Sequence, residues 1–283
     1  MGSLKPARKK NRVIPGFGLS MGVTLSMLSL IVMIPLLSIF VVLSDVGPAD
    51  LWKAISDPQA VAAYKISLLC ALAAALVNAV FGTILAWIIV RYRFPGRRIL
   101  DGLIELPFAL PTAVAGIALT TLYADSGWIG RLFAGIGVKI AYTPVGITIA
   151  LIFIGIPFVV RSIQPVLEKL DGQYEEAATM LGAGLLRTFR RVVFPEIRPA
   201  LLTGFGLAFA RGLGEYGSVI FIAGNIPYKT QIVPLVIMSK LEQFNYGAAT
   251  SIALVMIVFS FLTLFAINFI QSRLNHAAKG AEN

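Results

Sequence analysis

Arg211 and Glu215 are the residues of this sequence best placed for ionic chemistry, because each is a charged residue inside an apolar stretch. They are four positions apart, so a helix over residues 200–224 puts both on one face. A charge at bilayer depth costs at least about 2.5–3.5 kcal/mol and normally faces the protein interior or water. Two interpretations stay open: a mutually neutralising pair that locks a helix bundle, or an anion pathway in which Arg211 supplies positive potential and Glu215 holds its orientation.

The stretch PFALPTAVAG, residues 107–116, places two prolines in another apolar run. Proline cannot donate to the helix ladder, so Pro107 and Pro111 leave backbone groups free near Thr112. The N-terminus of a half-helix suits an anion, which makes Pro111 and Thr112 further candidates for a translocation pathway. A proline kink that serves only packing is the alternative interpretation.

Residues 175–195, EEAATMLGAGLLRTFRRVVFP, form a charged block with a helical pattern. Ala177 and Ala178 give the first helix a small, smooth face that a partner can approach closely. Gly182 weakens that helix, so the block is predicted to be two short helices at an angle. Pro195 is predicted to end the second helix. The alternative is an interfacial amphipathic segment that only closes a loop.

No set of residues in this sequence predicts catalysis. The phosphate-binding pattern G-x-x-x-x-G-K-[ST] is absent, so the chain is not expected to hydrolyse ATP itself. GLGEYG, residues 212–217, matches G-x-G-x-x-G, but that fingerprint needs a preceding strand and here falls in an apolar helix. A single cysteine, Cys70, and a single histidine, His276, give no basis for a metal site. We therefore expect no catalytic residue, no metal and no cofactor.

The elements that carry these residues are predicted to be membrane-spanning helices. Hydrophobic residues make up 57% of the chain and charged residues 13%, which is typical of an all-α, polytopic membrane protein. A spanning helix needs about 20 largely apolar residues. Six stretches reach that length: 17–43, 66–90, 103–124, 142–163, 200–224 and 250–270.

The distribution of lysine and arginine sets the predicted orientation. Most of the 24 basic residues fall on the side that carries both termini and the charged block, so this side is expected to be cytoplasmic. The net charge of +10 does not indicate nucleic-acid binding, because the basic residues are dispersed between apolar spans. The predicted organisation is a basic cytoplasmic N-terminus (1–16), a first transmembrane helix (17–43), a transmembrane domain (60–271) that includes a cytoplasmic loop (164–199), and a cytoplasmic tail (272–283).

Seven residues of the charged block follow a fixed spacing: Glu176, Ala177, Ala178, Gly182, Val192, Phe194 and Pro195. This spacing resembles the EAA loop of ABC importer permeases, which reads EAA, then G, then I-x-L-P. Here valine stands for the isoleucine and phenylalanine for the leucine. The resemblance implies a type I importer permease fold (MetI-like) with six transmembrane helices, and a coupling loop that docks into a groove on a separate cytoplasmic ATPase.

Longer stretches narrow the resemblance. Residues 65–116, 156–183 and 212–230 are similar to the sulfate/thiosulfate permease family of ABC importers (CysT or CysU type). The pieces GEYG and PFALPTAVAG are shared in similar form with molybdate permeases, whereas YRFPGR and IPFVVRSIQPVLE favour the sulfate type. No anion-contacting residue carries over from the family.

This family resemblance implies a set of partners. They are a CysW-type sister permease, two CysA-type ATPase subunits that bind the ATP, a periplasmic sulfate- or thiosulfate-binding protein, and the lipids of a bacterial inner membrane. A molybdate or tungstate importer, an ion-gradient-driven secondary anion transporter and an integral-membrane enzyme stay open as alternatives. The preference between sulfate and thiosulfate also stays open.

Overall fold

The computed structural model describes residues 17–280, and the predicted N-terminal segment 1–16 lies outside them. Within this range all regular secondary structure is helical, as the composition predicts. The helices are α1 (Phe17–Ser44), α2 (Pro48–Ile55), α3 (Pro58–Arg91), α4 (Arg97–Ala109), α5 (Thr112–Tyr123), α6 (Trp128–Ala134), α7 (Pro144–Lys169), α8 (Gln173–Met180), α9 (Leu185–Thr188), the π-helix η1 (Phe189–Val193), α10 (Phe194–Leu213), α11 (Val219–Ala223), α12 (Val233–Glu242) and α13 (Tyr246–Gly280).

Helix α1 belongs to a separate structural unit that ends at Gly47, and the remaining helices form a second unit from Pro48 onward. With 28 residues, α1 is about 42 Å long, which is sufficient to cross a bilayer. Its bounds match the predicted stretch 17–43.

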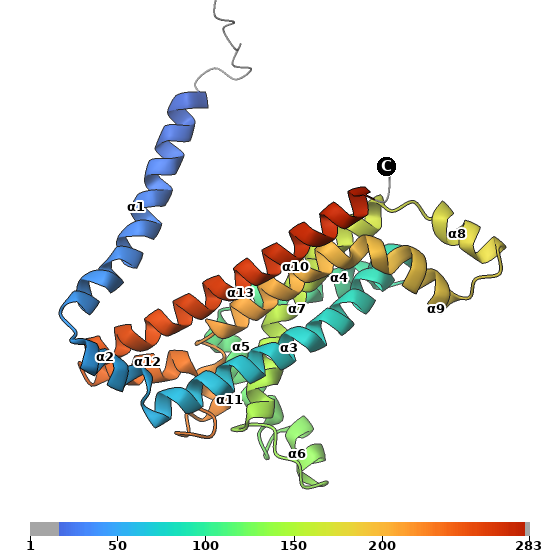
Figure 1. Ribbon diagram of the computed structural model, residues 1–283. Helices are drawn as coiled ribbons and strands as arrows, with labels where there is room; N and C mark the ends of the chain where they lie inside the picture. The colour runs from blue at the N-terminus through green and yellow to red at the C-terminus, as the bar shows by residue number, and fades with distance from the viewer. Residues whose placement is uncertain (1–16, 281–283) are drawn as a thin grey trace, which may run out of the picture. The chain divides into compact units, whose positions relative to one another are not determined.

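The second unit is built on three helices, α3, α7 and α10, which pack side by side (Figure 1). Their contacts depend on small residues. A Cβ atom on Gly82 of α3 would lie 2.8 Å from a methyl group of Val159 on α7. A Cβ atom on Gly204 of α10 would lie 2.7 Å from the Cα atom of the same Val159. Close backbone approach at glycine is the usual way in which helices associate in lipid.

The third predicted span, 103–124, is not one helix. Helices α4 and α5 meet at an angle of 113° across Leu110 and Pro111. Leu110 is extended, with φ −87° and ψ 135°, because the ring of Pro111 disfavours helical geometry in the residue before it. The chain therefore bends in this proline-containing stretch, and the bend at Pro111 interrupts the helix completely. Counting this pair as one span, the described residues contain up to six spans, of which five are single helices.

The fifth predicted span, 200–224, ends earlier than expected. Helix α10 ends at Leu213, and the chain turns through Gly214–Ser218 before the short helix α11. Glycines at 212, 214 and 217 explain this end, because glycine weakens a helix interior. The prediction of one helix across GLGEYG was therefore wrong.

The two ends of the second unit carry different short helices. Helices α8 and α9 project from the end where α3 and α13 terminate, while α2 and α12 lie at the opposite end (Figure 1). The predicted cytoplasmic block is therefore a protrusion from one end of the bundle, attached through α7 and α10.

Because α10 and α7 approach closely at Gly204, we expect a larger residue at this position to lower the stability of the protein. Gly204→Ala should lower the free energy of unfolding by about 1–3 kcal/mol, because the new methyl group meets the backbone of Val159. Thermal unfolding of the purified chain in detergent measures the loss. Gly102→Ala in α4 is the matched control, since nothing lies within 4 Å of its Cβ position, and it should be neutral or stabilising. Equal behaviour of the two variants would contradict the proposed close packing.

Candidate functional site

The charged block bends at Gly182, as predicted, and forms an elbow. Its first arm is the short helix α8, and its second arm is the start of a longer helix that continues from α9 into α10. Helix α8 carries Glu175 and Glu176 in its first turn, where the helix dipole favours negative charge. At its end, the N–H of Gly182 donates to the carbonyl of Thr179 at 2.9 Å, and the N–H of Ala183 donates to Ala178 at 3.0 Å. These bonds form a Schellman motif, which requires a left-handed residue in the position of Gly182. Gly182 has φ +79°, so glycine is the residue that fits without strain.

The tip of this elbow exposes a large apolar surface. Met180 and Leu181 are 90% and 89% exposed, and Leu185 and Leu186 beside them are also exposed. On α8, Glu176 and Ala177 are exposed and Ala178 is half-buried. A contiguous apolar patch rimmed by charged residues is a sign of a protein interface.

The remaining block residues lie at the base of the elbow. Val192 falls in the π-helical turn η1, and Phe194 and Pro195 form the first turn of α10. The ring of Phe189 stacks on Trp87 of α3, with centroids 4.7 Å apart, so this base is packed against the bundle. The structure therefore separates the predicted coupling residues: Glu176, Ala177, Ala178 and Gly182 lie in the elbow, and the other three anchor it.

Pro195 does not end a helix, contrary to the prediction. The helix runs from α9 through η1 into α10 without a break. A proline inside a helix removes one backbone hydrogen bond, and its ring crowds the carbonyl four residues back, so the helix has to adjust locally. The turn before Pro195 widens, so that the N–H of Phe194 donates to the carbonyl of Phe189, five residues back.

Arg211 and Glu215 form the predicted ion pair, with Nη1 and Oε2 separated by 2.5 Å. The two side chains differ in environment, because Glu215 is 1% exposed and Arg211 is 37% exposed. Oε1 of Glu215 accepts hydrogen bonds from the backbone N–H of Ser218 at 2.9 Å and from its hydroxyl at 3.0 Å. Glu215 lies beyond the end of α10, so the pair closes the turn after the helix instead of sharing a helix face.

The same turn lies against the N-terminus of α5. A Cβ atom on Gly217 would collide with Oγ1 of Thr112, and one on Gly116 would collide with the backbone of Ser218. Pro111 is the exposed N-cap of α5 and Thr112 its first residue. The structure thus brings the proposed pathway residues of both apolar runs to one turn, Gly214–Ser218.

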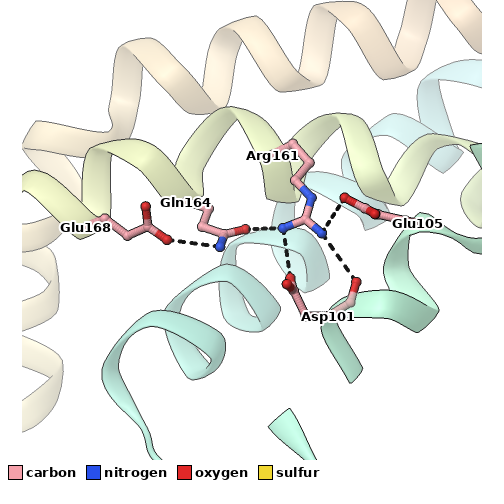
Figure 2. A network of polar contacts seen from close by, with 5 residues as sticks. All are labelled: Asp101, Glu105, Arg161, Gln164 and Glu168. Atoms are coloured by element: carbon pink, nitrogen blue, oxygen red, sulfur yellow. Dashed lines mark hydrogen bonds and ion pairs between the residues drawn. The ribbon is translucent and has the colours of Figure 1, made fainter. Parts of the chain in front are cut away.

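A second polar cluster, which the sequence reasoning missed, joins α4 to α7 (Figure 2). Arg161 of α7 pairs with Asp101 at 2.8 Å and with Glu105 at 2.7 Å, and it also contacts Gln164 of its own helix. Gln164 in turn donates to Glu168 at 3.0 Å. The available signal was Arg161 itself, a charge at the end of the predicted span 142–163. Its partners lie 56 and 60 positions away, beyond the reach of spacing arguments.

Multiple apolar helices with a charged elbow at one end define a multi-pass membrane transport component. The chain belongs to the family of binding-protein-dependent transport system inner membrane components, whose model matches residues 78–276. That match includes the whole elbow and both ion-pair clusters.

The particular relatives are sulfate permeases. The chain is 50% identical over 274 residues to the sulfate transport system permease protein CysT of Salmonella typhimurium, covering 97% of this chain and 99% of that protein. It is 49% identical over 274 residues to CysT of Escherichia coli, with the same coverage. The resemblance inferred from the sequence is confirmed.

A solved structure shares the fold. The bacterial alginate ABC transporter, in complex with an alginate pentasaccharide-bound periplasmic protein, contains a chain with a TM-score of 0.76. The match covers 91% of this chain and 94% of that chain at 16% identity. The ABC importer permease fold is therefore shown.

Because Glu215 is buried, we expect its carboxylate to stabilise the turn Gly214–Ser218. Glu215→Ala should lower the free energy of unfolding by roughly 3 kcal/mol, because it leaves the N–H of Ser218 and the guanidinium of Arg211 without their acceptor. Glu215→Gln should cost less, since its amide oxygen still accepts from Ser218. Thermal unfolding in detergent measures both losses, and an equal loss for the two variants would refute this account of the turn.

Proposed function

We propose that this chain is the permease subunit of an ATP-driven importer that translocates sulfate or thiosulfate. The observation that carries the substrate assignment is the similarity, over nearly the full length, to CysT proteins of two bacteria. The family assignment supports an importer with a separate binding protein. In this proposal the periplasmic protein delivers the anion, and the permease provides the path across the membrane.

The elbow is the proposed contact with the ATPase. Its tip is apolar and exposed, and Glu176 and Ala177 lie on the accessible surface of α8. The sequence has no phosphate-binding loop, so ATP is bound and hydrolysed by a partner. Two CysA-type ATPase subunits and a CysW-type sister permease complete the proposed complex, because a pair of ATPases needs a pair of elbows.

The proposed orientation places the elbow and both termini in the cytoplasm of a bacterium. Excess lysine and arginine on the elbow side support this orientation. The opposite loops, near 44–65, 125–141 and 225–249, then face the periplasm, where the binding protein docks.

The anion pathway is proposed at the turn Gly214–Ser218. Glu215 directs one oxygen to Ser218 and the other to Arg211, so the carboxylate is fully engaged in protein contacts. Arg211 is the exposed member of the pair, and the N-terminus of α5 lies beside the same turn. A guanidinium and a helix N-terminus are both suited to a divalent oxyanion. These features favour the pathway interpretation of Arg211 over simple mutual neutralisation.

Reconstitution of the complete importer in proteoliposomes tests the function. Sulfate uptake should require the ATPase, ATP and the sulfate-loaded binding protein, and purified permease alone should transport nothing. Uptake by the permease alone along a proton gradient would show a secondary transporter instead. Competition by molybdate and tungstate, with thiosulfate as a further competitor, tests the alternative substrates.

The coupling contact is tested in the same preparation by Ala177→Arg. A long charged side chain on the α8 surface should abolish co-purification of the ATPase and reduce uptake at least about tenfold, while membrane insertion is retained. Ala177→Ser keeps the surface small and should behave as the unmodified chain. Undiminished ATPase binding by Ala177→Arg would place the contact elsewhere.

Substitution of Arg211 separates its two interpretations. Arg211→Met should reduce sulfate uptake by about 10- to 100-fold without a matching loss of complex assembly, because it removes the positive charge offered to the anion. Arg211→Lys keeps that charge and should retain more uptake. If assembly and uptake fall together in Arg211→Met, the residue serves only to neutralise Glu215.

A further inference from the structure

Helix α8 is held to the bundle by little packing. None of its residues is buried, and its main packing partners are the neighbouring α9 and η1. On its other side it continues from α7 through a short link, residues 170–172. Hydrophobic burial therefore does not fix the direction of α8 relative to the membrane-spanning helices, and a more specific contact is needed.

Arg91, in the last turn of α3, makes that contact. Its Nε donates to Oε1 of Glu175 on α8 at 2.8 Å, and its Nη2 lies 2.8 Å from the same oxygen. Nη2 also donates to the carbonyl of Leu170 at 3.0 Å, which is one of the free carbonyls at the end of α7. One guanidinium thus joins three helices: α3, α7 and α8.

The environment strengthens this contact. The side chains of Arg91 and Glu175 are only 18% and 21% exposed, so water screens the pair less than it screens a surface ion pair. The planar guanidinium presents several donors in a fixed geometry, which lets it bond Glu175 and Leu170 at once. A lysine offers a single ammonium and does not match that arrangement.

Three neighbouring arginines provide a comparison. Arg93, Arg97 and Arg98 follow Arg91 closely, yet within residues 17–280 none of the three forms an ion pair. General attraction of basic residues to the cytoplasmic side accounts for these three. It does not account for the pairing of Arg91 with α8.

We infer that Arg91 is a positioning residue, which fixes the direction of α8 and passes its displacement to α3. The inference rests on the proposed docking of an ATPase on α8. When α8 moves, α7 follows through the covalent link, and α3 follows through Arg91 and Glu175. Since α10 is already continuous with α9, the link through Arg91 makes all three helices of the packed centre, α3, α7 and α10, follow the elbow together.

Transport coupling in the complete importer tests this role. Arg91→Ala should leave ATPase co-purification and ATP hydrolysis in place, but should reduce sulfate uptake per ATP hydrolysed by about tenfold. Arg93→Ala is the matched control, because it removes one exposed positive charge, two residues away, that has no ion-pair partner. An unchanged ratio of uptake to hydrolysis in Arg91→Ala would overturn the inference.

Exchange of the two charges tests the pair itself. Glu175→Arg alone should uncouple the importer, since it sets two cations against each other. Arg91→Glu combined with Glu175→Arg should recover at least part of the lost coupling. If the double variant is no better than either single variant, the ion pair does not position α8.

A distance measurement tests the positioning without any transport. Spin labels at Ile84→Cys and Met180→Cys, in a chain with Cys70→Ser, report on α3 and the end of α8. Both labelled positions are exposed, and Cys70 is the single native cysteine. The distance distribution should be narrow with Arg91 and with Arg93→Ala, and broad with Arg91→Ala. A narrow distribution in Arg91→Ala refutes the inference, whereas absence of ATP-driven uptake in the unmodified importer refutes the proposed function and leaves this measurement valid.

Discussion

Ionised side chains in an apolar bundle need partners, and this requirement orders the second structural unit. Arg91, Arg161 and Arg211 each bond a carboxylate that lies outside their own helix. Two of these pairs hold elements with few buried residues, α8 and the first half of the broken span. The third satisfies a carboxylate that is buried in the turn after α10. The glycine contacts between α3, α7 and α10 hold the centre, and the ion pairs attach the parts around it.

Much of this arrangement could be predicted from the sequence, because the apolar stretches and the spacing of the charged block are local signals. Two prolines show the limit of local reasoning. Pro111 breaks a helix, whereas the helix that contains Pro195 continues past it, although both prolines follow apolar residues. The difference comes from the π-helical turn before Pro195, which accommodates the proline and which the sequence pattern does not reveal. The partners of Arg91 and Arg161 were missed because tertiary contacts bring them together.

The family motif also has a physical basis in this chain. Gly182 has the left-handed backbone conformation that closes the C-terminal cap of α8. The small alanine side chains leave the surface of α8 accessible to a partner. Phe194 and Pro195 are the first residues of α10. The motif therefore includes both the proposed contact surface on α8 and the residues that attach the elbow to the bundle. Specificity for an oxyanion has no such local pattern. It was inferred from similarity to CysT proteins, and the geometry adds only that a cation and a helix N-terminus meet at one turn.

The π-helical turn at Phe189–Val193 has a consequence for the direction in which the elbow points. Such a turn holds one residue more than an α-helical turn, and one residue corresponds to a rotation of about 100°. Relative to an uninterrupted α-helix of the same sequence, the residues N-terminal to this turn, including Leu185 and Leu186, are therefore rotated about the axis of α10 by that amount. The extra residue thus sets which side chains face outward at the apolar tip. Deletion of one amino acid in this turn would restore α-helical geometry and leave the direction of the tip nearly unchanged, whereas an α-helical turn with all five residues kept would rotate the tip by about 100°.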